Sequence, residues 1–94
     1  MLDEENNIFI HNDEIIRLGT IETSLLSYLI ARRYVRTTAE QISKKIYGAS
    51  LDKCTKDAVT TLINKLNKKL KGILKIQSKF RLGYRVIYVE QNIK

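Results

Sequence analysis

The feature that most constrains the fold is an unbroken apolar stripe in the second half of the chain. The apolar residues recur at helical spacing (i, i+3, i+4, i+7, i+11) and are Val59, Leu62, Ile63, Leu66 and Leu70. The opposite side of the same stretch is polar and consists of Thr60, Thr61, Asn64, Lys65, Asn67, Lys68 and Lys71. The pattern predicts a helix of about 15 residues, closed by Gly72, with one buried side and one side facing solvent.

Two shorter helices are predicted before it. The first begins at Thr20, and its apolar stripe consists of Leu25, Leu26, Leu29 and Ile30. The second begins with a capping box, in which the Thr38 hydroxyl accepts a hydrogen bond from the backbone of Gln41 and the Gln41 side chain reaches back. Gly48 is a natural residue to end it. The second and third helices together form a helix-turn-helix-like pair.

Short strands are predicted at both ends of the chain. Residues 8–10 and 15–18 read as two strands around a polar turn. Residues 74–76 and 84–89 read as a hairpin whose basic turn spans residues 77–83. The expected fold class is therefore α+β, with two short strands, three helices and a C-terminal hairpin in that order.

The length and composition exclude several classes of protein. Ninety-four residues are expected to form one domain, 1–94, with a core of about 8–90. No apolar run is long enough for a membrane span, and no signal peptide is visible. Cys54 and His11 are the only residues of their types, so we expect no disulfide, metal site, cofactor or enzymatic activity.

The charge of the chain is placed unevenly. Lys and Arg number 17 against 10 acids, for a net charge of +7. Five of the acids lie in the first 16 residues, whereas eight basic residues and no acid lie between Asp57 and Glu90. A one-sided basic block attracts a polyanion through counterion release, and this favours nucleic acid over a merely soluble surface.

The polar side of the third helix carries side chains suited to nucleic acid. Asn64 can make a bidentate contact to adenine, and Lys65 can approach guanine O6 and N7. Thr60 and Thr61 are short enough for phosphates or a thymine methyl. Base reading, phosphate contact and a plain solvated face all remain open for this side.

The turn of the hairpin combines apolar and basic residues. Because exposed apolar side chains are unusual in a simple loop, we expect either Phe80 or Leu82 to fold back onto the core. Lys79 and Arg81 would then project, and Arg81 could enter an adjacent minor groove. Protection of a strand edge by charge is the alternative explanation.

The chain resembles the OmpR/PhoB-type winged-helix domains over about residues 8–90. The stretch 18–26 resembles the opening helix of that family, and the likeness continues through Val35, Thr38, Gln41 and Ile42 to residues 46–48. It resumes along the third helix and at residues 83–85. Residues 14–19 look most like the ToxR-like branch.

The resemblance implies a winged helix-turn-helix fold, with the third helix in the DNA major groove and the hairpin as a wing on the minor groove and phosphates. The implied helix contacts are Thr60, Thr61, Asn64, Lys65, Asn67 and Lys68. The wing contacts are Lys79, Arg81 and Arg85, with Phe80 at the matching tip. In some relatives the loop between the second and third helices contacts RNA polymerase, which makes Leu51, Asp52 and Lys53 candidates here.

The leading hypothesis is therefore sequence-specific double-stranded DNA binding by a cytoplasmic bacterial transcriptional regulator. Family members often bind direct repeats, so we expect a weak or DNA-dependent homodimer. We expect no receiver domain before the helices, and a stand-alone regulator and the cytoplasmic part of an inner-membrane regulator are both open. The alternative is a winged-helix protein-interaction module whose basic face docks on an acidic protein.

Overall fold

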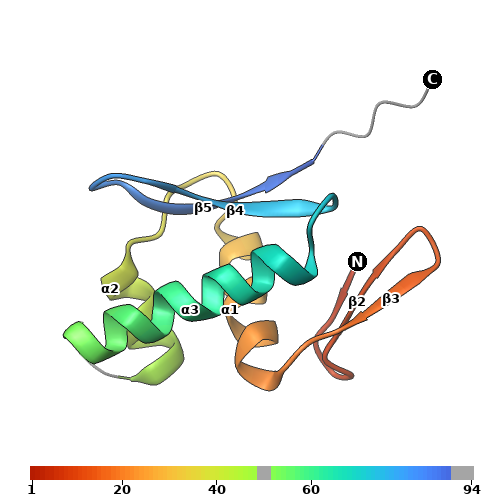
Figure 1. The fold of residues 1–94 in the computed structure, drawn as a ribbon, viewed down its shortest axis with the longest axis horizontal. Coiled ribbons are helices and arrows are strands. Elements are labelled where there is room, and N and C mark those ends of the chain that lie inside the picture. The colour runs from red at the N-terminus through yellow and green to blue at the C-terminus, as the bar shows by residue number, and fades with distance from the viewer. Residues whose placement is uncertain (49–51, 90–94) are drawn as a thin grey trace.

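The computed structural model describes residues 1–48 and 52–89 (Figure 1). A three-stranded antiparallel sheet comes first, with the order β1 (Leu2–Asp3), β2 (Ile8–His11) and β3 (Glu14–Arg17). The helices follow: α1 (Thr20–Ala31), α2 (Ala39–Ile42) continued by the π-helical turn η1 (Ser43–Tyr47), and α3 (Lys53–Lys69). The chain then forms the hairpin β4 (Leu74–Lys79) and β5 (Gly83–Tyr88). The predicted α+β order is confirmed.

The N-terminal sheet forms around the predicted polar turn. His11 pairs with Glu14, and the two residues between them, Asn12 and Asp13, have φ angles of 49° and 66°. Positive φ at both central residues is the geometry of a tight hairpin turn, and Asn and Asp tolerate it better than other non-glycine residues. Phe9 is buried and fixes the sheet to the core. The short strand β1 was not predicted, because two residues give too little pattern to detect.

Capping explains where the helices begin. At α2, the Thr38 Oγ1 accepts a hydrogen bond from Gln41 N at 3.1 Å, and the Gln41 Oε1 accepts one from Thr38 N at 2.9 Å. This confirms the predicted capping box. Gly48 ends the following turn with a φ of 63°, as predicted. At α3, the carboxylate of Asp52 accepts from Thr55 N, so the helix starts earlier than its apolar stripe indicates.

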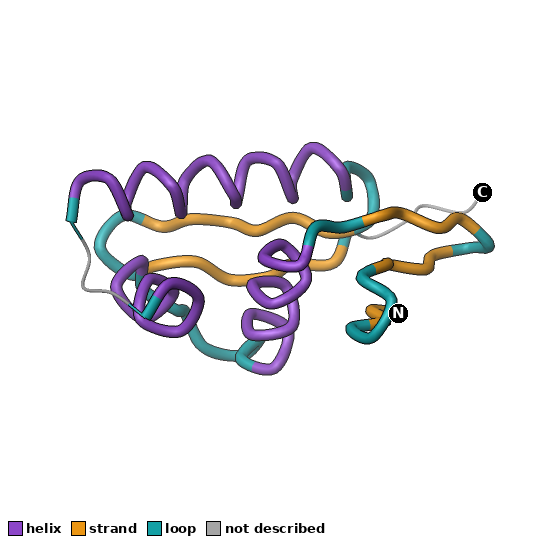
Figure 2. Tube along the Cα trace, turned by 90° about the horizontal axis from the view of Figure 1, so that it is seen from below, coloured by secondary structure: helices purple, strands orange, loops and turns teal. Residues whose placement is uncertain are grey.

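The apolar side of α3 forms the centre of the core. All five residues of the predicted stripe are buried, together with Leu25, Leu26 and Leu29 of α1 and Ile42 of α2. Leu74, Ile76 and Val86 of the hairpin complete the core from the other side. Figure 2 shows α3 running alongside the hairpin for most of its length. The polar side of α3 is thereby left free next to the hairpin.

The first hairpin strand, β4, is longer than predicted, whereas β5 has the predicted length and begins one residue earlier. Pairing runs from Leu74 with Tyr88 to Lys79 with Gly83, so only residues 80–82 lie outside the ladder. The alternation of strand side chains places Leu74, Ile76 and Val86 on the face toward the helices. No helix among the described residues is long and apolar enough to cross a membrane.

Candidate nucleic-acid interface

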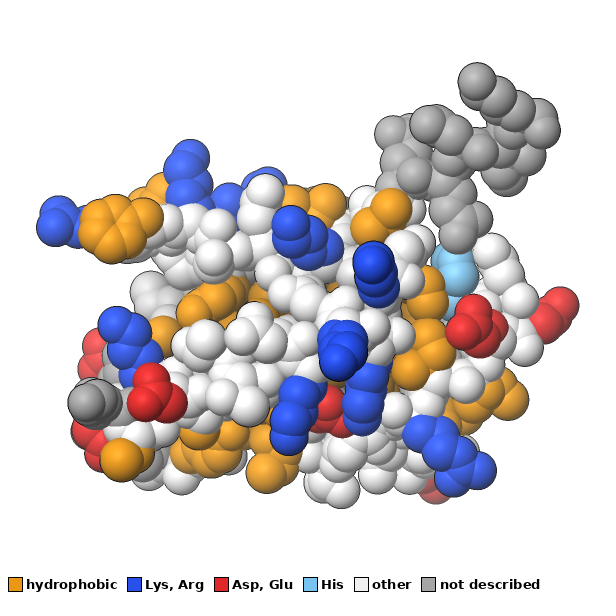
Figure 3. Space-filling model, viewed as in Figure 1, with side chains coloured by type: hydrophobic (Ala, Val, Ile, Leu, Met, Phe, Trp, Pro, Cys, Tyr) orange, Lys and Arg blue, Asp and Glu red, His pale blue; other side chains and the backbone are white. Residues whose placement is uncertain are grey.

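The outward side of α3 is an exposed polar surface. Thr60, Thr61, Asn64, Lys65 and Lys68 are all exposed. Figure 3 views the molecule from this side and shows basic side chains spread over α3 and the hairpin, with acidic ones mainly toward the two ends. The five predicted helix contacts therefore share one accessible surface, which we call the α3 face.

Asp57 also belongs to the α3 face, although it is not among the contacts predicted from the sequence. It is exposed and lies three, four and seven residues before Thr60, Thr61 and Asn64, which is the spacing of one helix side. The signal that would have found it is this spacing. A carboxylate there can accept a hydrogen bond from a cytosine amino group, and it repels phosphate.

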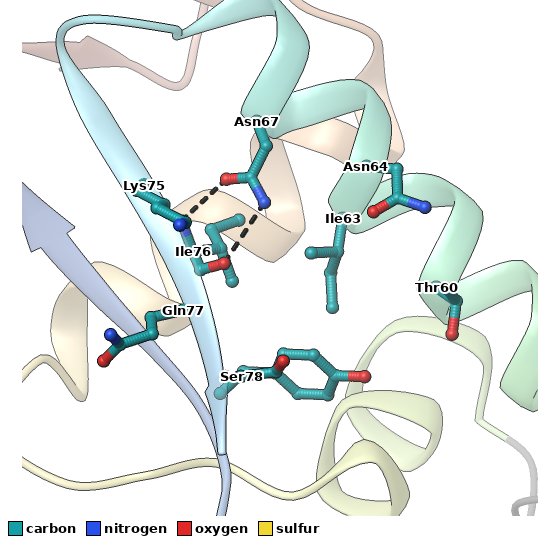
Figure 4. A pocket seen from close by; sticks show the side chains of 9 residues that line it. Thr60, Ile63, Asn64, Asn67, Lys75, Ile76, Gln77 and Ser78 are labelled. Atoms are coloured by element: carbon teal, nitrogen blue, oxygen red, sulfur yellow. Dashed lines mark hydrogen bonds between the residues drawn. The ribbon is translucent and has the colours of Figure 1, made fainter. Parts of the chain in front are cut away.

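The sixth predicted contact, Asn67, is engaged inside the protein (Figure 4). Its Nδ2 donates to the backbone oxygen of Ile76 at 3.1 Å, and its Oδ1 accepts from the backbone N–H of Ile76 at 2.7 Å. The side chain is half-buried between α3 and β4. Asn67 therefore links α3 to the free edge of β4, and both polar atoms of its side-chain amide are hydrogen-bonded to Ile76.

A groove of about 400 Å³ separates the α3 face from the hairpin. Thr60 and Asn64 line it from the helix, and Gln77 and Ser78 line it from β4 (Figure 4). In Figure 4 the Asn64 amide takes no part in the hydrogen bonds that Asn67 makes, and Asn64 is an exposed residue of the groove lining. A ligand on the α3 face therefore meets helix and hairpin groups together.

An ion pair fixes the far end of the α3 face to α1. The Lys69 Nζ lies 2.6 Å from Oε1 of the buried Glu22, which also accepts from Gly19 N at 2.7 Å. Burial by itself would raise the pKa of Glu22, but these hydrogen bonds and the charges of Lys69 and Lys65 outweigh it and lower the pKa. Lys65 therefore balances a buried carboxylate in addition to facing solvent.

The tip of the hairpin differs from the sequence expectation. The prediction that Phe80 or Leu82 folds back onto the core is wrong, because their exposed fractions are 86% and 51%. The physical reason is the length of the ladder: Lys79 pairs with Gly83, and the last buried residues of the strands are Ile76 and Val86. The tip therefore extends past the core, with Arg81 at a φ of 64°.

The hairpin is held in place by Arg36 and Thr37, which lie just before α2 and were not predicted from the sequence. Thr37 exchanges two backbone hydrogen bonds of 2.8 Å with Tyr84, so β5 is paired with β4 along one edge and with Thr37 on the other. Arg36 donates to the Gly83 carbonyl at 3.2 Å and to Gln77 Oε1 at 3.3 Å. No periodic pattern marks a single bridging residue, so only the adjacent capping box hinted at this region.

The remaining predicted positions are spread over the surface. Lys79 and Arg81 are exposed at or beside the tip. Arg85 pairs with Gln77 and shares the strand face that points away from the core, so it is separated from the α3 face by the hairpin. Asp52 is the N-cap of α3 and Lys53 its first residue, while Leu51 lies outside the described residues.

Among the residues that the structure describes, no group of three or more His, Cys, Asp or Glu side chains is placed to hold a metal ion. The single cysteine, Cys54, is exposed in the first turn of α3. The organised features are instead the α3 face and the basic hairpin beside it. This arrangement defines the class of winged-helix DNA-binding domains.

Comparisons with known proteins give the family. The model described as "Transcriptional regulatory protein, C terminal" matches residues 12–86, and the chain belongs to this family, the OmpR/PhoB-type DNA-binding domains of transcriptional regulators. The family is not enzymatic, in agreement with the sequence prediction. A search of curated proteins finds no match.

Solved structures share the fold. The DNA-binding domain of Bacillus subtilis CssR is 26% identical, with a TM-score of 0.78 over 93% of this chain and 98% of that one. The DNA-binding domain of the response regulator AdeR, solved in complex with an intercistronic region, is 18% identical, with a TM-score of 0.73 over 92% and 91%. The Escherichia coli CadC domain is 14% identical, with a TM-score of 0.66 over 90% and 86%. The CadC match is consistent with the ToxR-like resemblance, and at this identity it concerns the fold.

Proposed function

We propose that the chain binds double-stranded DNA in a sequence-specific manner as part of a bacterial transcriptional regulator. In this arrangement α3 enters the major groove, and the hairpin acts as a wing on the minor groove and the phosphates. The observation that carries the proposal is the α3 face: a row of exposed side chains capable of contacting bases, flanked by a basic hairpin. The likeness to AdeR, which was solved with DNA, supports it.

The dimensions of the two elements suit a duplex. The 17 residues of α3 span about 26 Å at the usual helical rise, and a major groove admits one helix. The six residues of each hairpin strand extend about 20 Å alongside it. A helix seated in the major groove therefore brings the hairpin tip to the neighbouring backbone and minor groove.

The residues divide into three roles. Asn64, Lys65, Thr60 and Thr61 are the proposed base-facing contacts of the α3 face, with Asp57 accepting from a base amino group. The proposed phosphate contacts, which position the protein without reading sequence, are Lys68, Lys79, Arg81 and Arg85. Asn67 is a positioning residue in this proposal, because its amide holds β4 at a fixed distance from the helix.

The further partners follow from DNA binding. One domain forms a small interface, so two copies on repeated half-sites would raise the affinity, and self-association would depend on DNA. Leu51, Asp52 and Lys53 remain the candidate contacts for RNA polymerase. The site of action would be the cytoplasm, where bacterial DNA lies. The protein-interaction alternative has less support, because the matched family consists of DNA-binding domains.

The test is a binding selection from a random duplex library, followed by salt titration on the recovered and a scrambled sequence. We expect a recurring motif bound at least about 10³-fold more tightly than the scrambled duplex. Lys68→Ala should reduce the slope of log binding constant against log salt concentration by about one for both duplexes. Lys44→Ala is the matched control, because that lysine pairs with Glu40 on another helix. Salt-dependent binding without a motif would overturn sequence specificity and bring the acidic-partner alternative forward.

A further inference from the structure

The tip of the hairpin exposes apolar surface that the fold does not use. Phe80 is 86% exposed, and Leu82, two residues later, is 51% exposed. A phenylalanine is normally among the more buried residues, so one left in water at the end of a hairpin indicates a contact made elsewhere. Hydrophobic and basic atoms meet at this left-hand end of the hairpin in Figure 3.

The tip is held in a defined conformation. Leu82 N donates to the Lys79 carbonyl at 3.0 Å and closes a tight turn around Phe80 and Arg81. Arg81 has a φ of 64°, a left-handed conformation that costs a non-glycine residue energy. Just below the turn, Thr37 and Arg36 fix the hairpin against the rest of the protein. The two apolar side chains are therefore presented on an anchored support.

The charges around the tip indicate which kind of partner its apolar side chains contact. Lys79 and Arg81 flank Phe80, and the Arg81 guanidinium lies 5.1 Å from the centre of the Phe80 ring. A surface hollow of about 480 Å³ connects the tip with Lys56 of α3 and with Ala39 and Glu40 at the start of α2. The Glu40 carboxylate is paired with Lys44 at 3.6 Å, so Lys56, Lys79 and Arg81 leave the hollow with an excess of positive charge. An apolar group flanked by cations and placed next to α3 is complementary to the sugars and base edges of DNA between two rows of phosphates.

We propose that Phe80 is an apolar wedge that enters the minor groove beside the α3 site, partly unstacks one base step and bends the duplex. Arg81 and Lys79 then neutralise the phosphates on either side. Pyrimidine–purine steps unstack most easily, so the wedge also adds a sequence preference at a position that no polar side chain reads. This inference rests on the proposed function, and it adds a residue and a DNA deformation to it.

The probe is a duplex of about 30 base pairs that carries the selected motif, with a fluorophore at each end and 2-aminopurine at the step under the wing. Energy transfer between the ends reports bending, and 2-aminopurine fluorescence reports unstacking. The proteins compared are the natural chain, Phe80→Ala, Phe80→Leu and Tyr34→Ala. Tyr34 is the matched control: its ring is 84% exposed and also lies beside an arginine, Arg33, but between α1 and α2.

For the natural chain we expect a bend of about 20° or more and a rise in 2-aminopurine fluorescence. Phe80→Ala should lose both signals and the preference at the wing step, while it selects the same α3 motif. Phe80→Leu should retain part of the bend, and Tyr34→Ala should behave like the natural chain.

Three results would overturn the wedge. One is motif binding by the natural chain without a bend, and another is an unchanged bend with Phe80→Ala. The third is a Phe80→Ala protein that binds a duplex with two sites without cooperativity but bends a single-site duplex as the natural chain does. The tip would then contact a second copy of the protein instead of the minor groove. Failure to recover any motif is a separate outcome, since it would overturn the proposed function together with the wedge.

Discussion

Asn64 and Asn67 provide a matched pair that separates DNA reading from wing positioning. Both are asparagines on α3, three residues apart. The amide of Asn67 makes two hydrogen bonds to Ile76, whereas Asn64 is exposed at the groove (Figure 4). The same substitution by alanine therefore removes an internal link at one position and a candidate DNA contact at the other.

The magnitudes follow from those contacts. Asn67→Ala deletes two hydrogen bonds of about 0.5–1.5 kcal/mol each, which gives a loss of about 1–3 kcal/mol in the free energy of unfolding. For a domain of this size the melting temperature should fall by about 5–20 °C. Asn64→Ala should change stability by no more than about 0.5 kcal/mol, because it alters an exposed position.

DNA binding should show the opposite order. Asn64→Ala should weaken binding to the selected duplex by about 1–3 kcal/mol and leave binding to scrambled DNA unchanged. Asn67→Ala, measured well below its melting temperature, should keep the preferred motif. Thermal unfolding and binding titrations on the two duplexes test both variants. Unchanged stability in Asn67→Ala, or an equal loss on both duplexes in Asn64→Ala, would refute the division of roles.

Further substitutions test the ion pair, the wing and the α3 face. Lys65→Ala should weaken binding by about 1–3 kcal/mol on the selected duplex alone, and an equal loss on scrambled DNA would reassign Lys65 to a phosphate. Gly83→Ala should unfold or displace the wing, since its φ is 101° and a Cβ would lie 2.7 Å from the Thr37 carbonyl carbon; an unchanged melting temperature would contradict this. Glu22→Gln should cost about 1.5–3 kcal/mol at neutral pH. Because folding lowers the pKa of Glu22 below its usual 4.5, the stabilisation is present above that pH and lost as the pH falls through the lowered value, so urea unfolding curves of the two proteins should converge in acid.

The main elements were predictable because their signals are periodic or stereochemical. The apolar stripe of α3 repeats over three turns, and the Thr38 capping box is recognisable from four consecutive residues. Gly48 ends a helix with a positive φ, which glycine adopts readily because it has no Cβ. Such features depend on neighbours in the sequence, so they can be inferred without a structure.

The features that escaped prediction depend on contacts between distant residues. Asn67 has the spacing of an exposed helix residue, and only the position of β4 reveals that Ile76 occupies its amide. The side of the hairpin on which Arg85 lies is set by strand register. The exposure of Phe80 follows from how far the ladder extends beyond the core, which composition and periodicity do not encode.

The central claim, that the α3 face and the hairpin tip together form the DNA-binding surface, is tested most directly by NMR titration of the isotope-labelled protein with the selected duplex. We predict that the largest amide shifts and intermolecular contacts fall on residues 57–68 of α3 and 79–82 of the tip, with the strands β1 to β3 little affected. A footprint centred on β1 to β3, with residues 57–68 and 79–82 little affected, would contradict it.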